Sequence, residues 1–372
     1  MRMEAHRSDG EEEPILNFRL LAEDFEIVKK VHASEKEKFL GMLGEKRVEL
    51  TSVQKGLTSL ANEGIANILH RYDIDLPERV YKQTDVVPLS FAEYKKVLGQ
   101  ETKQGFPDAE GVYIPEVDKA LLWYKENPWH KDVRNQEFLH TVIHGLGHAK
   151  SYRALKAFRE REEEEKIALV SEYRSGLRII KLASSEAVLF HSLNEAITET
   201  LAIEVTNGIM NANREVFRVE IIQQINWEIE KVWSIKTTKD PRVATMKEKM
   251  QKAGWVSGRP SLEWQQEFQK KIFDEYQYAY PAKFQSYKKE RGVFERLITT
   301  LAEKSEDYKN KEDEIRGLFY HAYFSGRLLT VGRLVEKTLG KGTFRMVAEM
   351  GYDKGTKQLS IPKELEDRLN RF

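Results

Sequence analysis

Three histidines at four-residue spacing are the residues of this chain best suited to metal chemistry. They are His140, His144 and His148, in the stretch LHTVIHGLGHAKSY. On an α-helix, residues four apart lie on one face on successive turns. Two imidazoles placed in this way can bind one metal ion through their ring nitrogens. The stretch therefore predicts a metal-binding helix with His144 and His148 as the ligand pair.

A third ligand must come from another element. Catalytic zinc commonly has three protein ligands and keeps a fourth position open, and a glutamate is a frequent third ligand of a histidine pair. The stretch LNEAITETLA carries Glu195, with Glu199 one turn later on the same helical face. We expect Glu195 to complete a Zn²⁺ site. Glu199 is expected to accept a hydrogen bond from a ligand histidine and so to fix the orientation of its ring.

The motifs HGLGH and NEAITE together resemble those of the gluzincin metallopeptidases, a family that includes thermolysin and anthrax lethal factor. The family pattern is H-E-x-x-H, followed by a helix with N-E-[AG]-x-x-[DE]. The resemblance implies zinc bound by His144, His148 and Glu195, with Glu199 supporting a ligand histidine. It also implies a zincin-like core and a peptide or protein as substrate or ligand.

The resemblance covers roughly residues 77–205. The stretch GVYIPEVDKALLWY is similar to the strand pair that precedes the metal helix in many gluzincins, where the last strand pairs with bound peptide. The later stretch HAYFSGRLL is similar to a Tyr-x-x-Gly helix of several bacterial members. By that similarity Tyr323 is expected to donate its hydroxyl to the developing oxyanion, with Tyr320 and His321 as competing candidates.

The position of the family's catalytic glutamate is occupied by Gly145. Hydrolysis at such a site needs a base for the attacking water and an acid for the leaving amine, and groups of this kind contribute on the order of 10² to 10⁴ in rate. Glu137 shares the helical face but lies nearly two turns before His144, too far to substitute. We therefore predict a metallopeptidase-like protein that binds zinc and is inactive or strongly weakened as a peptidase.

Two other interpretations remain open on the sequence. One is an active zinc metallopeptidase that takes its base from elsewhere. The other is a metal-free helical interaction protein whose histidines only pack. His140 is expected to lie beside the metal site or to pack, and His191 to face either the cleft or the core.

Composition excludes several classes of protein and site. Lysine plus arginine equals aspartate plus glutamate at 60 each, so no net charge favours nucleic acid or an anionic membrane. The chain has no cysteine, which excludes disulfides and thiolate ligands. No apolar run reaches membrane-spanning length. We expect a cytoplasmic protein, and the oligomeric state stays open.

Apolar spacing predicts an α+β fold that is mostly α, with a small sheet and two metal-binding helices in the middle of the chain. Strands are expected at 79–89, 112–115 and 120–124, helices at 91–98, from about Ser184 and at 314–339, and helix breaks at Pro241, Pro260 and Pro281. The metal helix is expected to be capped by Asp132 or Asn135 and to run to about Leu155. The predicted units are a disordered tail at 1–14, a helical N-terminal region at 15–76, a zincin-like core at 77–210 with a charged helical insertion at 156–183, and a helical C-terminal subdomain at 211–372.

Overall fold

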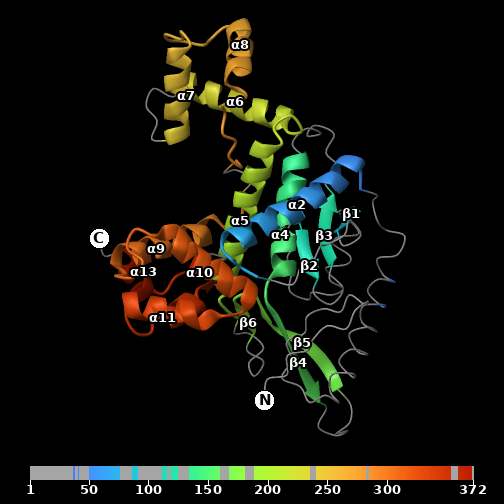
Figure 1. The fold of residues 1–372 in the computed structure, drawn as a ribbon, viewed down its shortest axis with the longest axis vertical. Helices are drawn as coiled ribbons and strands as arrows, with labels where there is room; N and C mark the ends of the chain where they lie inside the picture. The colour runs from blue at the N-terminus through green and yellow to red at the C-terminus, as the bar shows by residue number, and fades with distance from the viewer. Residues whose placement is uncertain are drawn as a thin grey trace.

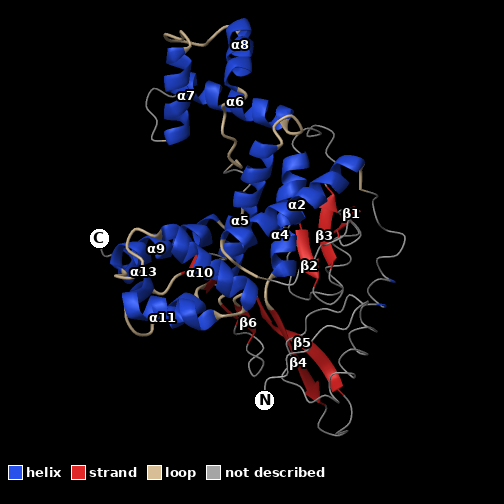
Figure 2. Ribbon diagram, viewed as in Figure 1, coloured by secondary structure: helices blue, strands red, loops and turns tan. Residues whose placement is uncertain are grey.

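The computed structural model describes most of the chain between Leu50 and Asn370. The described residues are 50–75, 86–90, 111–114, 119–124, 134–159, 167–180, 188–234, 240–281, 285–352 and 359–370, with Glu37 and Gly41. This part is mostly helical and contains a small three-stranded sheet, as expected from the sequence (Figure 2). The predicted tail at 1–14 and the predicted helix at 91–98 lie outside it.

Three helices form the centre of the molecule. Helices α4 (Arg134–Lys150) and α5 (His191–Ala212) pack side by side, and α2 (Ser52–Arg71) crosses both (Figure 1). Residues on all sides of α5 are buried, which is typical of a central helix. Gly147 allows α4 to approach α5 closely, because a Cβ there would lie 3.2 Å from Cγ2 of Thr198.

The start of α2 is fixed by a capping box. The Thr51 hydroxyl accepts from the backbone N–H of Gln54 at 3.2 Å, and the Gln54 side chain accepts from the backbone N–H of Thr51 at 3.0 Å. Two N–H groups that the helix leaves without a partner are satisfied in this way. The buried face of α2 carries Leu57, Ala61 and Ile65, and this helix packs against α4 and α5.

The small sheet lies against α4. Strand β2 (Gly111–Ile114) is antiparallel to β3 (Lys119–Tyr124), and β1 (Val86–Ser90) is parallel to β3 on its other side. The strand pair expected before the metal helix is therefore confirmed. The expectation that the last strand pairs with bound peptide is not met, because both edges of β3 are already paired. Among the described strands, an added strand could join this sheet only at β1 or β2.

The helix predicted at 156–183 is wrong. This region contains strands of a four-stranded antiparallel sheet, and the β4–β5 pair extends away from the helices (Figure 1). The run from Ile167 is rich in β-branched and aromatic residues, which favour strands, and Gly176 with φ of 57° turns the chain after β5. The densest charges, at 160–166, lie outside the described residues. The strands are β4 (Arg153–Arg159), β5 (Ile167–Ser175), β6 (Arg178–Ile180) and β7 (Val188–Leu189).

Because the chain forms these strands, the neighbouring helices are shorter than the sequence predicted. Helix α4 ends at Lys150 rather than near Leu155, and α5 begins at His191 rather than near Ser184. Asn135 lies inside α4 and is not its cap, while Asp132 is outside the described residues.

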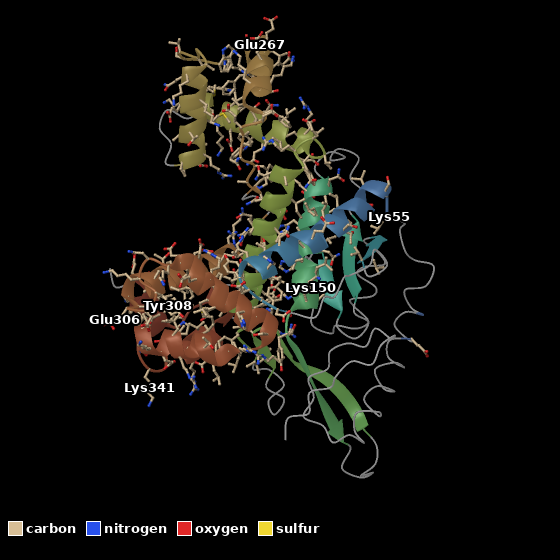
Figure 3. The ribbon with its side chains drawn as sticks, in the orientation of Figure 1. Lys55, Lys150, Glu267, Glu306, Tyr308 and Lys341 are labelled. Carbon is tan, nitrogen blue, oxygen red and sulfur yellow. The ribbon has the colours of Figure 1, made fainter. Side chains whose placement is uncertain are left out.

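The helices after α5 form two groups, and the breaks expected at the three prolines are confirmed. Figure 1 shows α6–α8 at one end of the molecule and α9–α13 beside the lower part of α5. In Figure 3, Glu267 on α8 marks the first group, and Lys341 and Glu306 mark the second. The elements are α6 (Arg218–Ser234), α7 (Pro241–Lys252), α8 (Leu262–Ile272), α9 (Lys288–Lys304), α10 (Glu312–Ser325), α11 (Leu328–Leu339), α12 (Thr343–Glu349), β8 (Gly351–Tyr352), β9 (Leu359–Ser360) and α13 (Lys363–Asn370).

The single helix expected at 314–339 is divided into α10 and α11. Gly326 ends α10 with φ of 77°, a left-handed conformation that favours glycine. A Cβ at this position would lie 2.7 Å from the ring of Tyr152, so the close approach also requires glycine. None of the helices in the described ranges has the length and apolarity needed to span a bilayer.

Candidate metal site

The packing of α4 against α5 brings His144, His148 and Glu195 together. Nε2 of His148 lies 3.3 Å from Oε2 of Glu195, and Nε2 of His144 lies 3.6 Å from the same oxygen. The two Nε2 atoms are 3.2 Å apart. One possible ligand atom from each residue thus falls in a cluster less than 4.8 Å across. Two nitrogens and one oxygen from two helices converge on one point.

These separations match the size of a zinc site. Zinc binds histidine nitrogen and carboxylate oxygen at about 2.0 to 2.2 Å in tetrahedral geometry, which puts neighbouring ligand atoms about 3.3 to 3.5 Å apart. The side chains of His144 and His148 are 18% and 17% exposed, whereas that of Glu195 is 8% exposed. The cluster is therefore largely shielded by protein. The donor set and its spacing fit zinc.

Glu199 holds the far side of His144. Its Oε2 lies 3.1 Å from Nδ1 of His144, and both of its oxygens lie 3.2 Å from Nε2 of His140. The backbone N–H of Ser286 donates to Oε1 at 2.8 Å. A carboxylate in this position favours the tautomer of His144 that carries its proton on Nδ1 and leaves Nε2 free as a ligand atom. The structure therefore brings Glu199 to His144, one of the two histidines that the sequence analysis expected as ligands.

His140 packs beside the site. Its ring is stacked on Tyr280 with centroids 4.2 Å apart, and its Nδ1 lies 3.4 Å from the Thr206 hydroxyl. Both ring nitrogens of His140 thus have a partner, Thr206 or Glu199. This agrees with the expectation that His140 lies beside the metal site or packs. His191 lies at the margin, with Nδ1 3.9 Å from Oε1 of Glu195, and burial lowers its pKa.

Charge is balanced within the cluster. Burial by itself would lower the pKa of His144, but hydrogen bonds to Glu195 and Glu199 outweigh it and raise that pKa to about 9. Burial would likewise raise the pKa of Glu195, but the charges and hydrogen bonds of His148 and His144 hold it well below its usual range. The pKa of Glu199 is also lowered, because the bonds to His140 and His144 outweigh its burial. The two carboxylates and the imidazole of His144 therefore favour one another's charged forms.

Gly145 is buried within α4 and offers no side chain to this cluster. In the described part of the chain, Glu195 and Glu199 are the carboxylates seen in contact with the site histidines, and both are engaged by them. A carboxylate held in this way is occupied in orienting and balancing imidazole. The described site therefore shows no replacement for the absent glutamate.

Tyr323 lies behind His148. Its hydroxyl is 2.8 Å from the Thr198 hydroxyl and 3.5 Å from Nδ1 of His148, whereas the nitrogen facing Glu195 is Nε2. The side chain is fully buried, and burial raises its pKa. This position suits a residue that orients His148 and does not suit the oxyanion donor expected from the sequence.

The two competing candidates for that role are engaged elsewhere. Tyr320 donates its hydroxyl to Glu204 at 3.2 Å, and His321 lies 3.0 Å from the Ser325 hydroxyl. Neither of these contacts involves the metal cluster.

Tyr287 is a site residue that the sequence analysis missed. Its ring is parallel to that of His144, with centroids 6.0 Å apart and an angle of 10°. The charge of Glu195, together with burial and a hydrogen bond to Glu195, raises the pKa of Tyr287. It stands just before α9 with φ of 49°, a conformation uncommon for tyrosine. No motif surrounds it, and the sequence carries no signal that would place it near His144 and Glu195.

No protein-family model, no curated protein and no solved structure matches this chain. The resemblance to gluzincins therefore rests on the four stretches of sequence named above.

Proposed function

We propose that this chain is a zinc-binding protein of the metallopeptidase type that is inactive or strongly weakened as a peptidase. His144, His148 and Glu195 hold the ion, and Glu199 orients His144. The observation that supports this best is the spacing of the three donor atoms, 3.2, 3.3 and 3.6 Å, from side chains that meet across two helices. That spacing is close to the edge of a zinc coordination tetrahedron.

Bound zinc acts as a Lewis acid and lowers the pKa of water. The chain's own residues supply the remaining roles. Tyr323 and Glu199 orient the rings of His148 and His144 through contacts to their Nδ1 atoms. The hydroxyl of Tyr287 is hydrogen-bonded to Glu195. No described residue takes the proton-transfer role that a glutamate at position 145 would have. The geometry therefore supports metal binding more strongly than turnover.

A peptide or protein is the proposed ligand. The sheet of β1–β3 packs against the metal helix through β2 and β3, and β1 and β2 are its outer strands among the described residues. An extended peptide that added to one of these strands would run beside the helix that carries His144 and His148. Zincin-type architecture and peptide binding are both part of the proposal.

Cleavage of a complex peptide library, measured by mass spectrometry, tests this function. The zinc-loaded chain is compared with its Gly145→Glu and His144→Ala variants. We expect little cleavage by the chain itself and at least about 10²-fold more by Gly145→Glu, because that change restores a general base. A Gly145→Glu variant that binds zinc normally and cleaves no peptide would contradict the proposed peptidase scaffold. Efficient cleavage by the unmodified chain, abolished by His144→Ala, would show a working enzyme with its base elsewhere.

A further inference from the structure

Part of the chain between α8 and α9 is bound to α5 by asparagine side chains. The backbone N–H of Tyr278 donates to Oδ1 of Asn211 at 2.8 Å, and the Asn211 amide donates to the Tyr278 carbonyl at 3.0 Å. One turn earlier on α5, Oδ1 of Asn207 accepts from the backbone N–H of Tyr280 at 2.6 Å. These bonds fix the path of the segment along the helix that carries Glu195.

The residues just before α9 reach the metal site. The backbone N–H of Ser286 donates to Oε1 of Glu199 at 2.8 Å. Gln285 fixes the chain at this point, because its amide donates to the Tyr280 carbonyl at 2.7 Å and its oxygen accepts from Nη1 of Arg291 at 2.6 Å. The turn that leads into α9 is thus held on both sides, and the residue after Ser286 is placed next to the cluster.

That residue, Tyr287, contacts both helices of the metal cluster. Its ring is parallel to the ring of His144 on α4, with centroids 6.0 Å apart. Its hydroxyl is hydrogen-bonded to the carboxylate of Glu195 on α5. Oε2 of this carboxylate lies 3.6 Å from Nε2 of His144 and 3.3 Å from Nε2 of His148. A donor on the carboxylate restricts its rotation and so keeps Oε2 directed at the histidine nitrogens.

The backbone of Tyr287 indicates that more than packing keeps a tyrosine here. Its φ of 49° lies in the left-handed region, which is unfavourable for a residue with a Cβ and is adopted most readily by glycine. Such conformations persist where the surrounding structure imposes them, and they concentrate at functional sites. At this position the strained backbone brings the ring and the hydroxyl to two of the proposed zinc ligands.

We propose that Tyr287 is a positioning residue of the zinc site, whose hydroxyl holds Glu195 as a ligand and whose ring supports His144. The three ligands therefore depend on a third element, the segment that leads into α9, and not on α4 and α5 alone. This inference rests on the proposed function, because it takes His144, His148 and Glu195 as the zinc ligands.

Metal titrations of the full-length chain test the proposal. Competition with a chelator gives the zinc affinity, and the visible absorption of Co²⁺ bound in place of zinc reports on ligand geometry. Tyr287→Phe keeps the ring and removes the hydroxyl. We expect it to bind zinc about 10-fold more weakly, the low end of the cost of losing a group that supports a metal ligand. Its cobalt spectrum should also differ from that of the unmodified chain, whereas loss of a merely structural contact would leave the spectrum unchanged.

Tyr276→Phe is the matched control. Tyr276 is also a buried tyrosine whose hydroxyl donates to a buried glutamate, Glu228, at 2.7 Å, and it makes no contact with the metal cluster among the described residues. Its replacement should leave zinc affinity and the cobalt spectrum unchanged. Ser286→Ala should do the same, because Ser286 contacts Glu199 through its backbone N–H and not through its hydroxyl.

Gln285→Ala is a second test that leaves Tyr287 itself intact. It removes the side-chain bonds that fix the turn and should weaken zinc binding several-fold. A folded Tyr287→Phe with unchanged zinc affinity and an unchanged cobalt spectrum would overturn the proposal. If Tyr287→Phe does not fold, unchanged values in Gln285→Ala would overturn it. Zinc that is lost in His148→Ala under either result leaves the proposed function standing, whereas no zinc in the unmodified chain would overturn both.

Discussion

Helices α5 and α6 both bury glutamate side chains, but the two regions handle the charge in opposite ways. On α5, histidines surround Glu195 and Glu199 and hold the pKa of each below its usual range. On α6, Glu228 is 2% exposed, accepts a hydrogen bond from the hydroxyl of Tyr276 at 2.7 Å, and has its pKa raised by burial. All three glutamates are buried. The environment of Glu195 and Glu199 favours their ionised form, whereas burial favours the neutral form of Glu228.

The difference comes from the kind of side chain that contacts each carboxylate and not from how deeply the carboxylate is buried. Imidazole can carry the compensating positive charge, and it also brings nitrogen atoms that bind metals. Phenol donates a hydrogen bond but carries no positive charge, so burial dominates at Glu228. A buried acid therefore indicates a metal site only where imidazole nitrogens converge on it. Helix α5 meets that condition through α4, and α6 does not meet it within the described residues.

The largest expected effect is on zinc affinity. Glu199→Gln keeps the shape of the side chain but removes the charge that holds His144. We expect zinc to bind roughly 10- to 100-fold more weakly, the usual cost of losing a group that orients a ligand histidine. Glu228→Gln should leave zinc affinity unchanged. Competition with a fluorescent chelator measures the zinc affinity of each variant and of the unmodified chain. Equal affinities in all three proteins would contradict the proposed difference between the two regions.

A smaller effect is expected on stability. Tyr276→Phe removes the donor to the buried Glu228 carboxyl and should lower the free energy of unfolding by about 1 to 3 kcal/mol. Urea denaturation measures the change, and zinc affinity serves as the control because it should not move. Unaltered stability would show that the Tyr276 hydrogen bond contributes nothing net to the fold.

The smallest effect concerns pH. Because the folded-state pKa of Glu228 is raised above its ordinary value of 4.5, the folded chain binds a proton more tightly than the unfolded chain does. The contribution of Glu228 to stability is therefore fully present below that ordinary value and is lost as pH rises through the folded pKa. Glu228→Gln should remove this loss and flatten the profile of stability against pH. A profile that is identical in both proteins would contradict a raised pKa.

For Glu199 on α5, the contribution to stability changes with pH in the opposite direction to that of Glu228. There the lowered pKa of Glu199 contributes stability that is present above the ordinary value and lost as pH falls through the folded pKa. The pH profile of Glu199→Gln should therefore differ from that of the unmodified chain on the acid side.

Local patterns predicted the elements that carry the site. The four-residue spacing of His144 and His148 predicts a helix, and the two short extended runs before it predict the β2–β3 pair; both are present. The charged segment was misassigned because its acidic run suggested a solvated helix, whereas the flanking β-branched and aromatic residues form β4 and β5. Tyr287 could not be predicted, because a left-handed backbone position and tertiary packing bring it to His144. Tyr323 was placed in the right neighbourhood but on the wrong side of His148.

Zinc content per chain, measured by elemental mass spectrometry after exhaustive dialysis, tests the central claim most directly. The unmodified chain is compared with His148→Ala and with His70→Ala, a change at an exposed histidine of α2. The account predicts a single zinc ion per chain in the unmodified protein and in His70→Ala, and its loss in His148→Ala with the helical circular dichroism signal retained. No bound zinc in the unmodified chain, or equal zinc in all three proteins, would contradict the proposed site.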